Sequence, residues 1–188
     1  SYLDAQGQPV SADSPAVAFS VYEIQVRHGI LYPPHPALAR EGETYRYHAL
    51  KPDDLNGIHT LADFAATGTR ELVAEDFVYQ IKRLAHPRLH SPIFGLMSEY
   101  IVGLKELAET LKAAEKSSKG GWLDLRNFKL DGVEAVDAHT FRVKLRGRYP
   151  QFSYWLAMNF FAPIPWEADK FYSQPGMAEK NLTLDWYP

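Results

Sequence analysis

The stretch TRELVAEDFVYQIKRLAHP, residues 69–87, decides the fold. Acidic residues lie in its first helical turn and basic residues in its last turn, as the helix dipole favours. Pro87 cannot continue a helix. Between these limits the apolar residues recur at helical spacing and form one stripe, which consists of Ala74, Phe77, Val78, Ile81, Leu84 and Ala85. The stretch therefore predicts one amphipathic helix over residues 74–85.

The segments before this helix predict one strand and a long irregular stretch. FSVYEIQVRHGI, residues 19–30, alternates apolar and polar residues, which is typical of a half-buried strand that ends at Gly29. Residues 1–18 are polar and rich in turn formers, so we expect them to be irregular. Three prolines in LYPPHPALAREGETY, residues 31–45, favour extended backbone. A short helix is expected around residues 60–66.

The segments after the helix predict two more helices and a hairpin. Apolar residues at helical spacing indicate a helix from Met97 to Lys116, followed by a flexible SSKGG connector. DGVEAVDAHTFRVKL, residues 131–145, has the alternation of a β-hairpin with a turn at residues 137–139. YPQFSYWLAMNFF, residues 149–161, predicts a short apolar helix after Pro150, over residues 152–160. No repeated βαβ pattern is visible, so the sequence predicts an α+β fold rather than a doubly wound sheet.

The composition excludes several classes of function. The chain has 188 residues, of which 46% are hydrophobic and 23% charged, as in ordinary globular proteins. Its net charge of −3 gives no basic excess for binding nucleic acid or anionic lipid. The absence of cysteine excludes disulfides, thiolate metal sites and cysteine nucleophiles. No run of about 18 apolar residues predicts a membrane span.

Residues that could carry chemistry have structural explanations. His86 and His90 are four apart, but Pro87 between them prevents a helix that would put both on one face. No HExxH motif is present, so we predict no metal site there. Glu75 and Asp76 are adjacent, point about 100° apart and suit the first turn of a helix. These patterns favour a binding or scaffold role over catalysis.

Four segments resemble a known family. VAEDFVYQIKRLAHP, residues 73–87, resembles the TAxDVxYSxxRxxDP-like helix of extracytoplasmic solute-binding proteins (bacterial family 5), which serve ABC importers of oligopeptides, dipeptides and nickel. YEIQVRHGI, residues 22–30, is similar to that family's F-x-L-R-x-G-V strand. Residues 130–158 resemble its G-V hairpin, T-x-x-x-x-L strand and P-x-F helix, and FFAPIPWEA, residues 160–168, resembles its proline-rich continuation. The segments occur in the family's order.

The resemblance implies a domain organisation. Residues 19–170 match the family's small α+β domain, part of a two-lobed periplasmic-binding-protein fold, with an insertion at about residues 31–68. Residues 171–188 match a truncated connector, which makes the chain an internal domain fragment. One departure is Val73, where the family has a threonine N-cap. Thr69 or a carboxylate must therefore accept the hydrogen bonds of the first amides of the helix. The matched positions carry structural roles: Ala74, Asp76, Tyr79, Gly132, Thr140, Pro150 and Phe152.

The resemblance also implies a function. Family members are not enzymes and need no cofactor; they capture a ligand by closing two lobes and deliver it to an ABC permease, outside the cytoplasm. The expected partners are therefore a peptide and a membrane permease, and not nucleic acid. No ligand-contacting residue is carried over, and nickel chelates and sugars stay open as cargo. Two alternatives are a ligand-sensing domain of a regulatory protein and a hydrolase that uses His35, His86 and Asp76.

Overall fold

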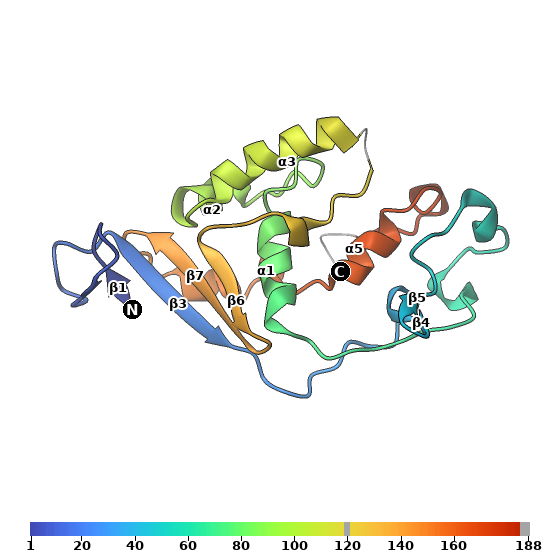
Figure 1. Cartoon of the computed structure of the whole chain (residues 1–188), viewed down its shortest axis with the longest axis horizontal. Helices are drawn as coiled ribbons and strands as arrows, with labels where there is room; N and C mark the ends of the chain where they lie inside the picture. The colour runs from blue at the N-terminus through green and yellow to red at the C-terminus, as the bar shows by residue number, and fades with distance from the viewer. Residues whose placement is uncertain (119–120, 185–188) are drawn as a thin grey trace.

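A five-stranded antiparallel sheet forms one end of the molecule (Figure 1). The computed structural model describes residues 1–118 and 121–184. Strands occur in the order β2-β1-β3-β7-β6. Their bounds are β1 (Tyr2–Leu3), β2 (Pro9–Val10), β3 (Phe19–Gln25), β6 (Val133–Asp137) and β7 (Thr140–Arg146). A separate two-stranded ribbon pairs β4 (Arg40–Glu41) with β5 (Thr44–Tyr45) at the other end.

Helices cover the sheet and extend the molecule away from it. In Figure 1, α1 stands beside the β6–β7 hairpin, α2 and α3 lie across the top, and α5 lies towards the end that holds β4 and β5. The bounds are α1 (Ala74–Arg83), α2 (Phe94–Tyr100), α3 (Leu104–Ser118), α4 (Phe152–Leu156) and α5 (Trp166–Tyr172). This mixture of helices with an antiparallel sheet confirms the predicted α+β class.

The predicted strand and hairpin are both present and pair with each other, although β3 ends at Gln25 rather than at Gly29. Strand β3 lies antiparallel to β7, with Ile24 opposite Phe141. The expectation that residues 1–18 are irregular is wrong in part. Strands β1 and β2 pair with each other, and β1 also pairs with β3, opposite Ser20 and Phe19. Such two-residue strands have no detectable periodicity. The edge of β3 gives β1 a partner, and β1 in turn gives one to β2.

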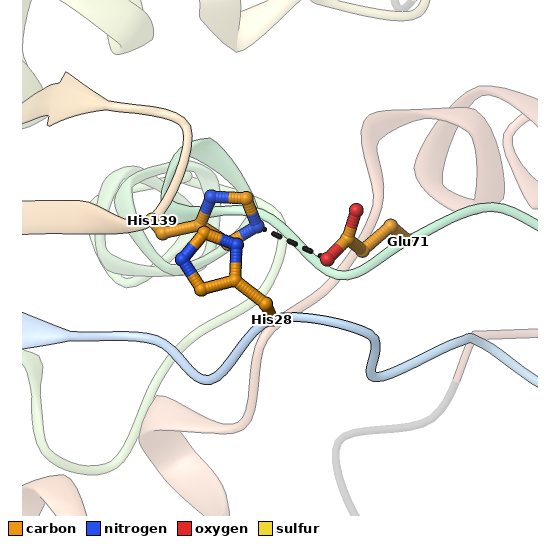
Figure 2. A group of neighbouring side chains, drawn as sticks. All are labelled: His28, Glu71 and His139. Atoms are coloured by element: carbon orange, nitrogen blue, oxygen red, sulfur yellow. Dashed lines mark hydrogen bonds and ion pairs between the residues drawn. The ribbon is translucent and has the colours of Figure 1, made fainter.

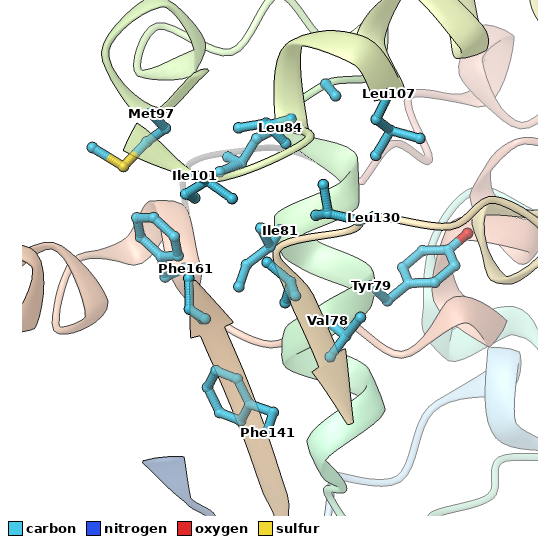
Figure 3. Packing of buried hydrophobic residues seen from close by; sticks show 14 of the residues in the cluster. Val78, Tyr79, Ile81, Leu84, Met97, Ile101, Leu107, Leu130, Phe141 and Phe161 are labelled. Atoms are coloured by element: carbon cyan, nitrogen blue, oxygen red, sulfur yellow. The ribbon is translucent and has the colours of Figure 1, made fainter. Parts of the chain in front are cut away.

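Helix α1 confirms the first prediction, but its burial extends well beyond the predicted stripe. The helix also buries polar residues on its other faces, including Asp76, Gln80 and Arg83, which are at most 2% exposed. Figure 3 shows α1 behind the hairpin strands, with Val78 and Ile81 among the packed apolar side chains. The helix packs against β6 and β7 on one side, while its polar residues meet α5 on another, so little of it faces solvent.

The single helix predicted from Met97 to Lys116 is wrong, because the chain forms α2 and α3 with a break between them. Ile101 leaves the helix to bridge Leu145 of β7. The next amide, on Val102, donates to the carbonyl oxygen of Lys144 at 3.1 Å. Gly103 then adopts a positive φ of 83° before α3 begins. The hydrogen bonds to β7 interrupt a helical apolar pattern that continues in the sequence. The predicted connector includes residues 119–120, which lie outside the described residues.

The other short-helix predictions are also shortened. The apolar helix expected over residues 152–160 is limited to α4, which is followed by a 3₁₀ turn at Asn159–Phe161. The bend between them stacks Phe161 edge-on against Phe152, with ring centroids 5.8 Å apart. The helix expected around residues 60–66 is a 3₁₀ turn at Leu61–Asp63.

A second apolar core joins the predicted insertion to the predicted connector. Ala37, Leu55 and Phe64, from the insertion at residues 31–68, pack with buried side chains from the C-terminal part of the chain. Those partners are Ala168, Phe171, Met177 and Leu182. The expected boundary after residue 170 falls inside α5, and Phe171 just beyond it is 0% exposed. The insertion is therefore an integral part of this second core.

Candidate functional site

The positions matched to the solute-binding family lie in the structural framework. Ala74, Asp76, Tyr79 and Phe152 are all at most 2% exposed. Three further matched residues lie at chain turns or strand ends, and these are Gly132, Thr140 and Pro150. The backbone approaches Gly132 so closely that a Cβ there would lie 2.4 Å from the carbonyl oxygen of Val102. Thr140 begins β7 opposite Gln25, and Pro150 is exposed just before α4.

An ion-pair cluster surrounds Asp76. The Arg70 guanidinium donates to both carboxylate oxygens of Asp76, at 2.9 and 2.6 Å, and to both oxygens of Glu167, at 2.8 and 2.7 Å. The two carboxylate side chains are only 3% and 2% exposed. Burial alone would raise the pKa of Glu167, but hydrogen bonds from Arg70 and Tyr45 outweigh it and lower that pKa. Two bidentate contacts of this kind fix α5 against the start of α1.

Asp76 also takes part in the hydrogen bonds at the start of α1, where Val73 cannot act as a side-chain cap. Its Oδ2 accepts the Val73 N–H at 3.0 Å. The next amide, on Ala74, donates to the Ala138 carbonyl oxygen at 2.8 Å. The Thr69 hydroxyl donates to the Tyr32 carbonyl oxygen. The Asp76 amide, which a hydroxyl at position 73 could bind, donates instead to the Val73 carbonyl oxygen at 3.0 Å. Of the two expected substitutes, the carboxylate therefore contributes by accepting the Val73 N–H, which is one half of a capping box.

A second polar cluster surrounds Asp169 of α5. Its Oδ2 accepts hydrogen bonds from the Tyr79 hydroxyl at 2.7 Å and from the Trp122 indole N–H at 2.9 Å. Its Oδ1 lies 3.2 Å from Nε of Arg83. Burial, with Asp169 beside it, raises the pKa of the Tyr79 hydroxyl far above its ordinary value. Tyr79 is thus a neutral hydrogen-bond donor that joins α1 to α5.

The residues of the hydrolase alternative make their hydrogen bonds with unrelated groups. His35 accepts the Ala37 N–H through Nδ1 at 3.0 Å and pairs through Nε2 with the Tyr172 hydroxyl at 2.9 Å. His86 accepts the Arg88 N–H through Nδ1. Burial lowers the pKa of both imidazoles. Asp76 is already bound by Arg70, so none of these hydrogen bonds links the three residues into one catalytic arrangement.

A different group of side chains does converge, at the end of the sheet next to the start of α1. Figure 2 shows His28, which follows β3, with its ring tilted against that of His139 in the β6–β7 turn, and Glu71 facing both. Nε2 of His139 lies 3.1 Å from Oε1 of Glu71, and the two imidazole centroids are 3.7 Å apart. Each side chain offers a ligand atom within 4.8 Å of the other two. Among the described residues this is the group that could hold a metal ion.

Hydrogen bonds hold Glu71 in its position. Its Oε1 accepts the Gly29 N–H at 2.6 Å. This bond, followed by the one from His139, lowers the pKa of the Glu71 carboxyl. Sequence reasoning missed the cluster because its members come from three segments with no characteristic spacing. The only signal was that His28 and His139 each lie at the end of a predicted strand.

Comparison with known proteins adds no assignment. No protein-family model matches the sequence, and no curated protein matches it. None of the helices in the described part of the chain has the length and apolar character needed to cross a bilayer. The family resemblance therefore stays a prediction.

Proposed function

We propose that the chain is the small α+β domain of the substrate-binding component of an ABC importer for oligopeptides or dipeptides. One observation carries the proposal. Segments that resemble the family in sequence order are also the segments that pack on one another: β3 pairs with β7, and α1 packs on the hairpin β6–β7. The matched residues with the lowest exposure, Ala74 and Phe152, both belong to that packed unit. If the matched residues serve the fold of the family's domain, they are expected at buried positions of this kind.

The polar clusters support a scaffold role within that proposal. Arg70 and Asp169 use their polar atoms to fix α5 against α1, so these charges serve the rigidity of the domain. A rigid domain suits a protein in which two lobes close on a ligand as bodies about a hinge. Ligand contacts would then come mainly from the rest of the importer component, and this domain would support one side of the cleft.

The test is ligand binding by the complete protein that carries this domain. Thermal denaturation is measured with pools of di- to octapeptides, with the 188-residue chain in parallel. A ligand at a hundredfold excess over its Kd stabilises the folded state by about 2.7 kcal/mol. We expect a shift in the complete protein and none in the chain alone. Absence of a shift in the complete protein with every pool would contradict peptide import.

The sensor alternative differs in what accompanies the domain. A regulatory protein would carry a DNA-binding helix-turn-helix, and an importer component would carry an export signal. The same complete protein therefore distinguishes the two by whether it is recovered outside the cytoplasm, which the import proposal requires.

A further inference from the structure

We propose that His28, Glu71 and His139 form a binding site for a single transition-metal ion of the Zn²⁺ class. Two imidazoles and one carboxylate are the ligands found in zinc sites that keep an open coordination position. Three residues from three separate segments meet at this point (Figure 2). None of the three residues is among the seven positions to which the family resemblance gives a structural role, and the proposal does not depend on the proposed function.

The distances are close to those of a bound ion. Metal–ligand bonds of about 2.0–2.1 Å in a tetrahedral site place neighbouring ligand atoms about 3.3–3.4 Å apart. Nε2 of His139 and Oε1 of Glu71 are 3.1 Å apart, so they need to separate only slightly. The ion would replace the hydrogen atom between them, and His139 would carry its proton on Nδ1. His28 is exposed, so its ring can move the remaining distance without disturbing the core.

The surroundings hold two of the three ligands in place. The Gly29 N–H fixes the Glu71 carboxylate, and such a second contact orients metal ligands in known sites. Asp137 accepts the backbone N–H of His139 at 2.8 Å and so fixes the turn that presents its ring. An open depression beside His28 and His139 leaves room for a water molecule as fourth ligand.

The ligand set also selects the kind of ion. Imidazole nitrogen favours Zn²⁺, Ni²⁺, Cu²⁺ and Co²⁺, whereas Mg²⁺ and Ca²⁺ prefer all-oxygen sites. A bound ion would join the end of β3, the β6–β7 turn and the segment three residues before α1. We therefore expect metal binding to stabilise the fold at this junction.

The experiment is calorimetric titration of ZnCl₂ into the purified chain, after treatment with a chelator and removal of any affinity tag. Wild-type protein is compared with His28→Ala, His139→Ala and Glu71→Gln. The control is the double variant His59→Ala/His90→Ala, which removes two other exposed histidines. Circular dichroism and urea unfolding without metal verify that each variant is folded. A parallel titration uses MgCl₂.

We expect one equivalent of Zn²⁺ to bind to wild type and to the control variant, with a rise in melting temperature, and no binding of Mg²⁺. Each of the three site variants should weaken Zn²⁺ binding at least about tenfold, since even residues that only orient a ligand have effects of 10–100-fold. Absence of saturable binding to wild type would overturn the proposal. So would equal loss in the control variant, or unchanged affinity in folded site variants.

Discussion

Replacement of Arg70 by methionine tests whether the buried ion pairs hold α5 against α1. Methionine retains an apolar stem but leaves Asp76 and Glu167 without their counter-charge, although their side chains are only 3% and 2% exposed. Removal of one partner from a buried pair costs about 3–5 kcal/mol. Because the Arg70 side chain is itself 24% exposed, we expect the lower end, about 3 kcal/mol. For a chain of this length that corresponds to a fall of about 6–12 °C in Tm.

The sign of the pH dependence makes the test specific. In wild type the pKa of Glu167 is lowered, so its contribution to stability is present at neutral pH and is lost as the pH falls through that pKa. Without Arg70, the hydrogen bond from Tyr45 still opposes the effect of burial, but the pKa of Glu167 rises relative to wild type, and protonation relieves the unpaired charge. The difference in stability between variant and wild type should therefore be largest near pH 7 and shrink towards pH 4.

Urea unfolding at several pH values measures this difference, with Arg142→Met as the matched control. Arg142 also pairs with a carboxylate, at 2.7 Å from Glu23, but these side chains are 44% and 49% exposed. Solvent screens such a pair, and we expect little or no change. Equal losses in the two variants, or a loss in Arg70→Met that does not depend on pH, would refute the reasoning.

Three further substitutions test other features of the fold. Gly132→Ala should lower the free energy of unfolding by about 1–3 kcal/mol, because the added Cβ would lie 2.4 Å from a backbone oxygen. In the control Gly95→Ala, in α2, the added Cβ meets no atom within 4 Å, and the change should be neutral or stabilising. Equal effects of the two changes in denaturant unfolding would contradict this. Phe152→Ala should lower the free energy of unfolding by about 3–5 kcal/mol, since the Phe152 side chain is 0% exposed. The control Tyr154→Ala, at a residue that is 75% exposed, should change Tm little. A small shift in Tm for Phe152→Ala would contradict the core role of Phe152. Burial lowers the pKa of His35 from 6.5, so the unfolded chain binds the proton more readily and the stability of the fold falls as the pH drops below 6.5. In His35→Asn the urea midpoint should depend less on pH between pH 5 and 8. An unchanged pH dependence would contradict this role of His35.

The local pattern of the sequence was enough to predict the main elements. Helix α1 follows from the spacing of its apolar residues and from Pro87, because both are properties of one short segment. Strand β3 and the hairpin follow from alternation for the same reason. One polar contact could also be predicted from the sequence, since an acidic residue such as Asp76 near the start of a helix is expected to interact with the free backbone amides there.

Long-range contacts decided what the sequence could not show. The apolar spacing runs without interruption through residues 97–116, yet bridging to β7 breaks the helix at Ile101, because hydrogen bonds to a distant strand replace those within the helix. The partners of Arg70 illustrate the same limit, since Glu167 lies 97 residues away.

The metal-binding cluster depends most on tertiary structure. His28, Glu71 and His139 have no meaningful spacing along the chain, and each has an ordinary sequence context. They meet because β3 pairs with β7, which brings the end of one strand beside the turn before the other. The sequence by itself therefore determined the elements, through interactions between near neighbours. Only the packing of those elements decided which distant polar groups share a site.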